Sequence, residues 1–439
     1  MNLHALLAKR TEAGRPVRVG LIGAGKFGAM FLAQVPHVPG LEVAAIADLD
    51  PDRARATLAS VGWDTARIAA TRFTDSGAAL IGMDAVEVVV EATGNPAAGI
   101  AHARAAIAGG KHIVMVNVEA DVLAGPLLAA EARAAGVVYS MAYGDQPALV
   151  SELVDWARSC GFRVVAAGKG TKYLPAYHTV TPDDVWAHYG LTPEAAQAAG
   201  MNPQMFNSFL DGTKSAIEMA AIANACGLDV PSAGLGFPPC GVDDLPHVLR
   251  PREDGGVLER AGMAEVVSSL ERDGRPVFRD LRWGVYVVIA APTPYAASCF
   301  AQYGLKTDAS GRYAAMYKPY HLIGLELGIS VLSAALRGEP TGQSREFRAD
   351  VVAVAKRALR QGEMLDGEGG YTVWGRVMPA ADSLARGALP IGLAHRVALR
   401  RGVAEGAVLT WDDVAALDSP AAQVRREMEQ RFGGVTIKQ

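Results

Sequence analysis

The stretch VGLIGAGKFGAMFL, residues 19–32, runs from a β-branched apolar segment through three glycines into an apolar helical pattern. Gly23 allows a tight turn, Gly25 lets a phosphate group approach the backbone, and Gly28 lets the following helix pack closely. The amide N–H groups at the start of that helix then face the anion. We therefore predict a loop that holds the pyrophosphate of a dinucleotide. Its expected contact residues are Gly23, Gly25, Lys26, Phe27 and Gly28.

A second strand, expected over Glu42–Ala47, ends on Asp48, twenty residues after Gly28. A carboxylate at this strand end is the usual partner of a ribose 2′-hydroxyl. Its charge favours NADH, because it repels the 2′-phosphate of NADPH. Arg53 and Arg55 follow closely and would offset that repulsion. Both NADPH and NADH therefore stay open as cofactors.

Strands and helices alternate beyond this point, which predicts a doubly wound parallel sheet. The expected strands are 86–91, 112–116 and 137–141, and the expected helices are 97–108 and 123–135. Open α/β sheets bind ligands at the carboxyl ends of their strands. Polar residues stand at those ends, and the candidates for cofactor binding among them are Thr93, Gly94 and Asn117.

The composition limits the class of protein. The chain has 439 residues, of which 50% are hydrophobic and 20% are charged, so two or three domains with large cores are expected. The net charge of −4 argues against a nucleic-acid partner. No apolar stretch approaches the roughly 20 residues that span a bilayer, and the N-terminal residues lack a signal-peptide pattern. We expect a cytoplasmic protein that has no membrane partner.

Later segments suggest further elements and domains. A helix over 147–159 and a strand over 162–167 are expected to extend the same sheet, and a helix is expected over 207–226. A strand over 282–291 precedes a helix over 322–336, which we expect to pack back against the nucleotide domain. The predicted division is a dinucleotide-binding domain over 1–170, an α+β substrate domain over 171–366 and a small β-rich module over 367–439.

Hydride transfer to a carbonyl needs a group that stabilises the developing alkoxide, and lysine suits this role. Asp211, Lys214 and Glu218 have the i, i+3, i+4 spacing that would place them on one helical face. An exposed salt bridge is the competing interpretation. The candidate catalytic residues are Lys214, Lys172, Glu119, Glu218 and His321. No zinc spacing occurs, whereas Mg²⁺ or Mn²⁺ leaves no spacing signature, so the metal ligands are unknown.

Two related families resemble this chain. The segments Val88–Gly94 and Gly110–Asn117 are similar to homoserine dehydrogenase, a Rossmann-fold family that continues from the asparagine into a lysine. Here Val118 and Glu119 follow instead, which disfavours homoserine oxidation. The chain as a whole resembles the deoxyxylulose-5-phosphate reductoisomerase-like oxidoreductases. The segments that carry this resemblance are 115–122, 144–147, 211–218 and 318–326, and the segment 402–414 resembles an SAF-type β-clip module.

The resemblance implies a reductoisomerase of isoprenoid biosynthesis. Such an enzyme converts 1-deoxy-D-xylulose 5-phosphate to 2-C-methyl-D-erythritol 4-phosphate with NADPH and a divalent cation, and the family forms homodimers or other homo-oligomers. The same resemblance includes relatives that act on other sugars or sugar acids, such as apionate oxidoisomerases. Two further functions compete with these, namely a homoserine-type dehydrogenase and a regulatory NAD-binding protein that senses a sugar.

Overall fold

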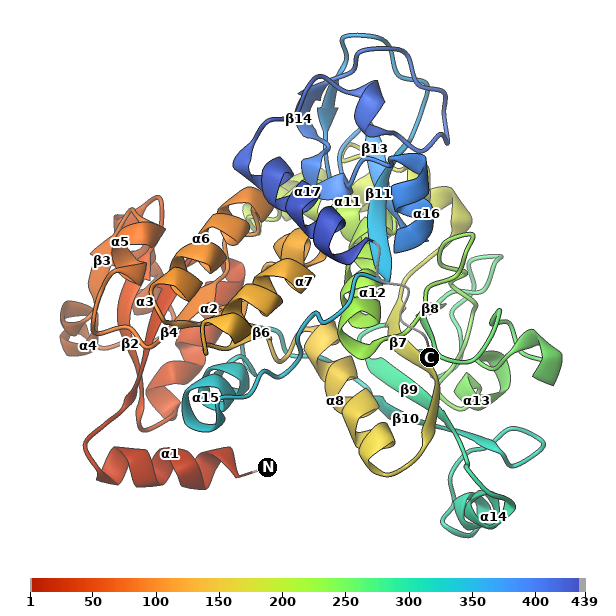
Figure 1. Cartoon of the computed structure of the whole chain (residues 1–439), viewed down its shortest axis with the longest axis horizontal. Coiled ribbons are helices and arrows are strands. Elements are labelled where there is room, and N and C mark those ends of the chain that lie inside the picture. Colours follow the sequence, from red (N-terminus) through yellow and green to blue (C-terminus); the bar gives the residue numbers. More distant parts are fainter. Residues whose placement is uncertain (1, 434–439) are drawn as a thin grey trace. The chain divides into compact units, whose positions relative to one another are not determined.

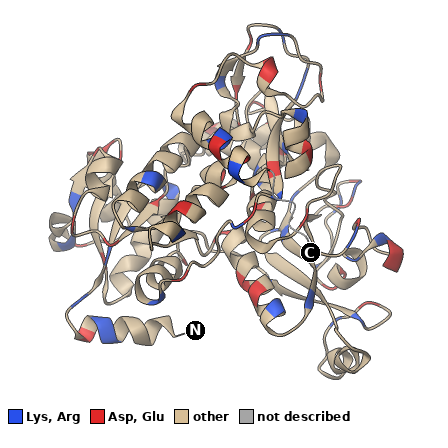
Figure 2. Cartoon of the chain, viewed as in Figure 1, with Lys and Arg blue, Asp and Glu red and all other residues tan. Residues whose placement is uncertain are grey.

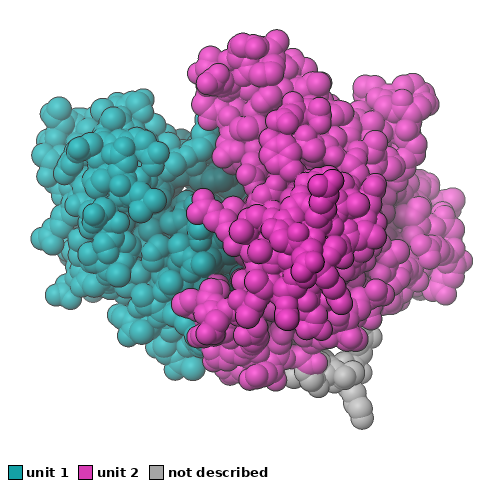
Figure 3. Space-filling view, turned by 90° about the horizontal axis from the view of Figure 1, so that it is seen from above, with its two compact units in different colours: residues 1–152, 321–345 teal, residues 153–320, 346–439 magenta. Residues whose placement is uncertain are grey.

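The computed structural model describes residues 2–433. These residues form two compact units, each made of two separate stretches of chain (Figures 1 and 3). Of the described residues, the first unit comprises 2–152 and 321–345, and the second comprises 153–320 and 346–433. The division into three functional domains at residues 170 and 366 stays a prediction.

The first unit contains a six-stranded parallel sheet in the order β3-β2-β1-β4-β5-β6, as predicted for a doubly wound fold. Its strands are β1 (Val17–Ile22), β2 (Leu41–Ala47), β3 (Arg72–Thr74), β4 (Val88–Glu91), β5 (His112–Met115) and β6 (Tyr139–Met141). Of these strands, β2, β3, β4 and β6 are labelled in Figure 1. Strands β1, β4 and β5 are almost continuously apolar, as is typical of strands that are buried on both faces. The short strand β3 was not predicted, because three residues carry too little periodicity.

Helices cover this sheet and supply the loops at its carboxyl edge. They are α1 (Leu3–Glu12), α2 (Lys26–Gln34), α3 (Pro51–Ser60), α4 (Thr65–Ala70), α5 (Gly77–Ile81), α6 (Pro96–Ala108), α7 (Val118–Ala134) and α15 (Gly328–Arg337), with a 3₁₀ turn η1 (Val35–His37). Helix α7 begins five residues before the predicted start, because the Asn117 side chain accepts a hydrogen bond from the Ala120 N–H at 3.1 Å and caps the helix there.

The late segment 321–345 belongs to the first unit. Helix α15 packs on β1, β4 and β5, so the prediction that this helix returns to the nucleotide-binding sheet is confirmed. Its predicted start at residue 322 is wrong, since residues 323–327 form turns and the helix begins at Gly328. Gly324, at φ +77°, lies against α2 so closely that a Cβ atom would stand 2.8 Å from the Phe27 carbonyl oxygen.

The second unit contains a four-stranded mixed sheet in the order β10-β9-β7-β8. Its strands are β7 (Arg163–Thr171), β8 (Met263–Ser268), β9 (Val285–Ala290) and β10 (Tyr313–Lys318). The expectation that β7 extends the first sheet is wrong: β7 pairs with β8 in parallel and with β9 in antiparallel orientation. An apolar run predicts a buried strand but carries no information about which strand lies beside it.

Helices and turns surround this second sheet. The helices are α8 (Gln146–Ser159), which begins in the first unit, α9 (Val185–Tyr189), α10 (Pro193–Ala198), α11 (Pro203–Leu210), α12 (Thr213–Cys226), α13 (Leu245–Val248) and α14 (Pro294–Gln302), with 3₁₀ turns η2 (Pro175–Thr179) and η3 (Arg252–Asp254). The predicted single helix over 207–226 is two helices, because Gly212 takes φ +89° between them. Asp211 therefore lies outside the helix that carries Lys214 and Glu218, and the predicted common face of the three residues is wrong.

The C-terminal part of the second unit is rich in β-structure. It contains β11 (Ala349–Ala355) paired with β13 (Val373–Pro379), β12 (Met364–Asp366) paired with β14 (His395–Ala398), helices α16 (Ala380–Arg386) and α17 (Pro420–Phe432), and 3₁₀ turns η4 (Ile391–Leu393) and η5 (Trp411–Asp413). The glycine-rich segment 367–370 is a tight turn between β12 and β13, in which Asp366 accepts the Thr372 N–H at 3.1 Å. The SAF-type assignment stays a prediction.

Charged residues of both signs are scattered over the chain. Figure 2 shows basic and acidic residues in both units, and the net charge of the sequence is −4. Of the helices in residues 2–433, none has the length and apolar character needed to cross a membrane.

A buried ion pair fastens α17 to β11. The Arg425 guanidinium donates to both carboxylate oxygens of Asp350 at 3.0 and 2.6 Å, and Arg425 is fully buried. We predict that Arg425→Ala lowers the free energy of unfolding by about 3 to 5 kcal/mol, because Asp350 is left as a buried unpaired charge. Urea denaturation followed by tryptophan fluorescence measures this.

The matched control is Arg426→Ala, which removes an exposed neighbour on the same helix and should cost less than about 1 kcal/mol. The double variant Asp350→Asn, Arg425→Met should recover most of the loss. Equal stability of the two single variants would show that the pair does not hold α17 in place.

A buried carboxyl group in the first unit gives a pH-dependent test. Asp121 accepts hydrogen bonds from Tyr139 at 2.9 Å and Ser344 at 2.8 Å, and burial raises its pKa to about 6. The folded protein therefore holds this proton up to a higher pH than the unfolded chain, and the group costs stability as the pH rises from about 4 to 7. We predict that Asp121→Asn gains about 3 kcal/mol relative to wild type across that range, measured by urea denaturation at several pH values. A constant difference would mean that Asp121 titrates normally.

Candidate functional site

The glycine loop after β1 has the geometry that a dinucleotide pyrophosphate requires. Gly23 takes φ +95°, and its N–H donates to the Ala47 carbonyl at 2.8 Å. A Cβ atom on Gly28 would lie 2.5 Å from the Gly23 carbonyl oxygen, so only glycine lets α2 begin this close to the loop. A Cβ atom on Gly25 would meet nothing within 4 Å, so open space lies in front of the helix N-terminus. Lys26 and Phe27 form the first turn of α2.

Asp48 lies at the carboxyl end of β2 and is tied to the same loop. Its Oδ2 accepts the Ala24 N–H at 2.9 Å, and its Oδ1 accepts the Asp50 N–H at 3.0 Å and an Arg53 N–H at 2.7 Å. Burial opposes ionisation of this carboxyl group, but the two backbone donors and Arg53 outweigh it and lower its pKa. Asp48 is therefore a carboxylate at neutral pH, with Arg53 exposed beside it.

The loops after β4 and β5 complete this edge of the sheet. Asn117 is buried and donates from its side chain to the Asn95 carbonyl at 2.9 Å, so it holds the loop that contains Thr93 and Gly94. The Thr93 hydroxyl donates to Glu91 at 2.5 Å. Gly94 takes φ +67°, and the space around it is open. Asn117 thus positions the loop, while Thr93 and Gly94 are exposed to a ligand.

Two of the predicted catalytic residues also belong to this unit. Glu119 is half-buried in the first turn of α7, directly after Asn117. His321 is half-buried, and its Nε2 lies 3.1 Å from the Gln146 side-chain nitrogen, which donates to it. The helix predicted from residue 322 would have placed His321 directly before it, whereas α15 begins seven residues after His321.

A buried ion pair joins β7 to α12 in the second unit. Lys169 contacts Glu218, and their side chains are 7% and 3% exposed. The sequence placed Glu218 on one helical face with Lys214 and Asp211 and did not predict this contact with Lys169. Asp211 instead lies 2.8 Å from Lys356, and its carboxylate also caps α12 at Thr213. Burial raises the pKa of Asp211, although Lys356 opposes this.

Lysines gather at this end of the second sheet. In the strand register Val285 pairs with both Lys169 and Lys318, so the two lysines lie on one face with their Cα atoms about 10 Å apart. Lys172 follows β7 and donates to the His188 carbonyl at 2.5 Å. Burial and the nearby Arg282 lower the pKa of Lys172. Lys214 is half-buried in the first turn of α12, one helical turn before Glu218.

Several contacts at this end of the sheet could not be predicted from the sequence. The partnership of Lys169 with Glu218, the shared row with Lys318 and the proximity of Arg282 to Lys172 all depend on strand pairing. The alternation of residues along a strand could have predicted which face of its strand Lys169 or Lys318 occupies. It could not have predicted that the two strands lie in the same sheet.

Acidic, histidine and cysteine side chains do not gather into a metal cluster in the described part of the chain. Within residues 2–433, no group of three or more His, Cys, Asp or Glu side chains is arranged to hold a metal ion.

Family models match two segments of the chain. Residues 17–117 match the model described as "Oxidoreductase family, NAD-binding Rossmann fold" (GFO_IDH_MocA). Residues 144–327 match the model described as "Oxidoreductase DRL, catalytic domain". The first match contains every predicted cofactor-binding residue, and the second contains Lys169, Lys172, Lys214, Glu218 and His321.

Solved structures of dehydrogenases resemble parts of the chain. A probable dehydrogenase from Thermotoga maritima is 15% identical, with a TM-score of 0.38, and the match covers 74% of this chain and 90% of that one. A homoserine dehydrogenase from Thiobacillus denitrificans is 21% identical over 49% of this chain and 50% of that one, with a TM-score of 0.37. A myo-inositol dehydrogenase from Lactobacillus casei is 16% identical over 39% and 50%, with a TM-score of 0.29. For the last two, the chain spans about half the length of the protein it matches. No curated protein matches the chain.

The geometry of this edge of the sheet fits a nicotinamide dinucleotide, in agreement with the matched Rossmann model. The features that fit are the open space at Gly25, the Asp48 carboxylate held by the Ala24 N–H, and the exposed Thr93 and Gly94. The chain is an NAD(P)-dependent oxidoreductase, in which residues 17–117 match an NAD-binding Rossmann model and residues 144–327 match a DRL catalytic-domain model.

Proposed function

We propose that the enzyme is a reductoisomerase that converts 1-deoxy-D-xylulose 5-phosphate to 2-C-methyl-D-erythritol 4-phosphate. The observation that carries the proposal is the group of basic residues at the end of β7, inside the segment that matches the DRL catalytic domain. The resemblance of the chain to reductoisomerase-like oxidoreductases supplies the reaction. A sugar phosphate carries a dianion and several oxygens, and clustered lysines and arginines are suited to bind both.

The residues divide into roles by their surroundings. Lys172 and Arg282 are placed to bind the substrate phosphate. The two cations lie near one another and repel, and a bound anion would offset this repulsion. Lys214 stabilises the oxygen that becomes negative during the carbon shift and the reduction. Lys169 and Glu218 neutralise one another in a buried pair, and this pair positions α12 rather than contacting substrate. Glu119 and His321 are proposed as proton-transfer groups.

The proposed reaction balances without a further reactant. The carbon shift turns the ketose phosphate into an isomeric branched aldehyde, and the aldehyde carbon then receives a hydride while its oxygen receives a proton. The cofactor, when bound, supplies the hydride. The protein holds the substrate, stabilises its negative oxygen and provides the proton. A metal site built by the protein is not part of this proposal.

A related oxidoisomerase that acts on a sugar acid is the second candidate, because the same cations would bind a carboxylate as readily as a phosphate. Oxidation of homoserine is disfavoured, since Glu119 stands where that family continues into a lysine.

Turnover assays separate these functions. We predict loss of NADPH or NADH absorbance with 1-deoxy-D-xylulose 5-phosphate, measured with and without Mg²⁺, and formation of the branched alcohol detected by mass spectrometry. Lys214→Ala should reduce kcat by about 100-fold or more, because a charged stabiliser of the transition state is removed.

Lys306→Ala, an exposed lysine of the same unit, is the matched control and should leave kcat unchanged. Circular dichroism checks that both variants fold. Turnover of apionate or another sugar acid, without turnover of the phosphosugar, would select the second candidate function. An unchanged kcat in Lys214→Ala would show that Lys214 has no role in the reaction.

The choice of cofactor has its own test. Asp48→Ser removes a carboxylate from the ribose end of the site, so the ratio of kcat/KM for NADPH to that for NADH should rise about tenfold or more. Asp52→Ser changes an exposed acid two residues beyond Asp50 and should leave the ratio unchanged. If the ratio is the same in Asp48→Ser and wild type, Asp48 does not face the ribose.

A further inference from the structure

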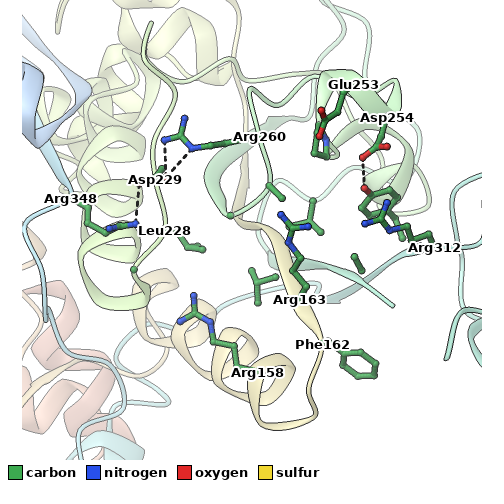
Figure 4. Close-up of a pocket in the computed structure, with 18 residues that line it drawn as sticks. Arg158, Phe162, Arg163, Leu228, Asp229, Glu253, Asp254, Arg260, Arg312 and Arg348 are labelled. Atoms are coloured by element: carbon green, nitrogen blue, oxygen red, sulfur yellow. Dashed lines mark hydrogen bonds and ion pairs between the residues drawn. The ribbon is translucent and has the colours of Figure 1, made fainter. Parts of the chain in front are cut away.

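A cavity in the second unit lies at the opposite end of β7 from the lysines described above. Its volume is about 580 Å³, and its walls come from the end of α8, the start of β7, the residues after α12 and the segments before β10 and β11 (Figure 4). Lys169 lies six residues along β7 from Arg163, which is about 20 Å at the rise of an extended strand. The cavity is therefore separate from the proposed catalytic residues.

Arginine dominates the charge of this cavity. Five arginines line it, namely Arg158, Arg163, Arg260, Arg312 and Arg348, against three acidic residues. Arg158 stands in the last turn of α8 and Arg163 is the first residue of β7, and Figure 4 shows both guanidinium groups directed into the open space. The walls between them include Phe162, Val165 and Leu228, which supply an apolar surface.

The acidic residues do not neutralise this charge. Asp229 is already shared by Arg260 at 2.7 Å and Arg348 at 3.3 Å. Asp254 accepts the Tyr313 hydroxyl at 2.5 Å, and Glu253 is exposed on the η3 turn. Across the described residues 2–433, no ion pair is made by Arg158, Arg163 or Arg312.

A second observation comes from Arg348. Its Nε is buried and has no hydrogen-bond partner among the described residues, although its terminal nitrogens contact Asp229 and Glu346. A buried guanidinium N–H without an acceptor costs free energy unless a ligand or water accepts the hydrogen bond. Exposed arginines that make no ion pair and border an open cavity, with a further unsatisfied donor in the wall, are the features of an anion site.

We propose that this cavity binds a small polyanion with two or more negative charges, either a phosphate ester or a polycarboxylate, independently of the nucleotide and of the proposed substrate. Guanidinium groups bind phosphate and carboxylate through the same paired N–H donors, so both sources share one chemistry. The volume accommodates a small metabolite, since ligand pockets of about 300 to 1,000 Å³ are typical.

Isothermal titration calorimetry of the full chain, saturated with NADPH, tests the site with pyrophosphate in one arm and citrate in the other. We expect one binding event per chain with at least one probe. Tighter binding of pyrophosphate than of citrate identifies a phosphate ester as the ligand, and tighter binding of citrate identifies a polycarboxylate. The double variant Arg158→Gln, Arg163→Gln should weaken binding about tenfold or more, because two charged donors are lost.

Two controls make the result specific. Arg400→Ala removes an exposed arginine of the same unit outside the cavity, and this variant should bind the probe as tightly as wild type does. Lys172→Ala changes a proposed phosphate-binding residue of the catalytic group, which lies outside the cavity, and should also bind the probe as tightly as wild type does. Thermal unfolding confirms that each variant is folded. Absence of heat with both probes at millimolar concentration, or binding that survives in the double arginine variant, would overturn the proposal. Loss of binding in Lys172→Ala alone would assign the anion to the catalytic residues instead and would also overturn it.

Discussion

The close approach of α2 to the turn after β1 is the constraint on which the nucleotide-binding unit depends. Gly28 lies so near the Gly23 carbonyl oxygen that no side chain fits there. This contact brings the free N–H groups of α2 to the carboxyl edge of the sheet, where the helix dipole favours an anion. Asp48 then anchors the turn through the Ala24 N–H, so the second strand and the loop are held as one piece. A dinucleotide meets a surface that is already ordered.

The second unit relies on a different device, the buried ion pair. Lys169 with Glu218 joins β7 to α12, Lys356 with Asp211 joins the residue after β11 to the turn before α12, and Arg425 with Asp350 joins α17 to β11. Such pairs contribute little net stability, because desolvation offsets the attraction, but breaking one leaves a costly buried charge. Their effect here is to fix which helix lies on which strand. The lysines at the end of β7 therefore keep their places relative to α12.

The two ends of β7 carry different chemistry. Its carboxyl end presents lysines within the segment that matches a DRL catalytic domain, and its amino end opens into a cavity lined by arginines. Both ends are basic in a protein whose net charge is −4, so the positive charge is local. Concentrated positive charge of this kind is a property of sites for anionic small molecules, whereas nucleic-acid binding needs an extended basic surface.

The sequence by itself determined the doubly wound sheet and the residues of the cofactor loop, because glycine spacing, strand-helix alternation and the acid after β2 are local patterns with direct physical meaning. It did not reveal that β7 leaves the first sheet, that Gly212 divides the predicted helix, or that Glu218 pairs with Lys169. Those facts depend on which apolar strand lies beside which, and many partners satisfy the same pattern. Only the tertiary structure decided them, since strand order and buried charge pairing result from packing between residues that are far apart in the chain.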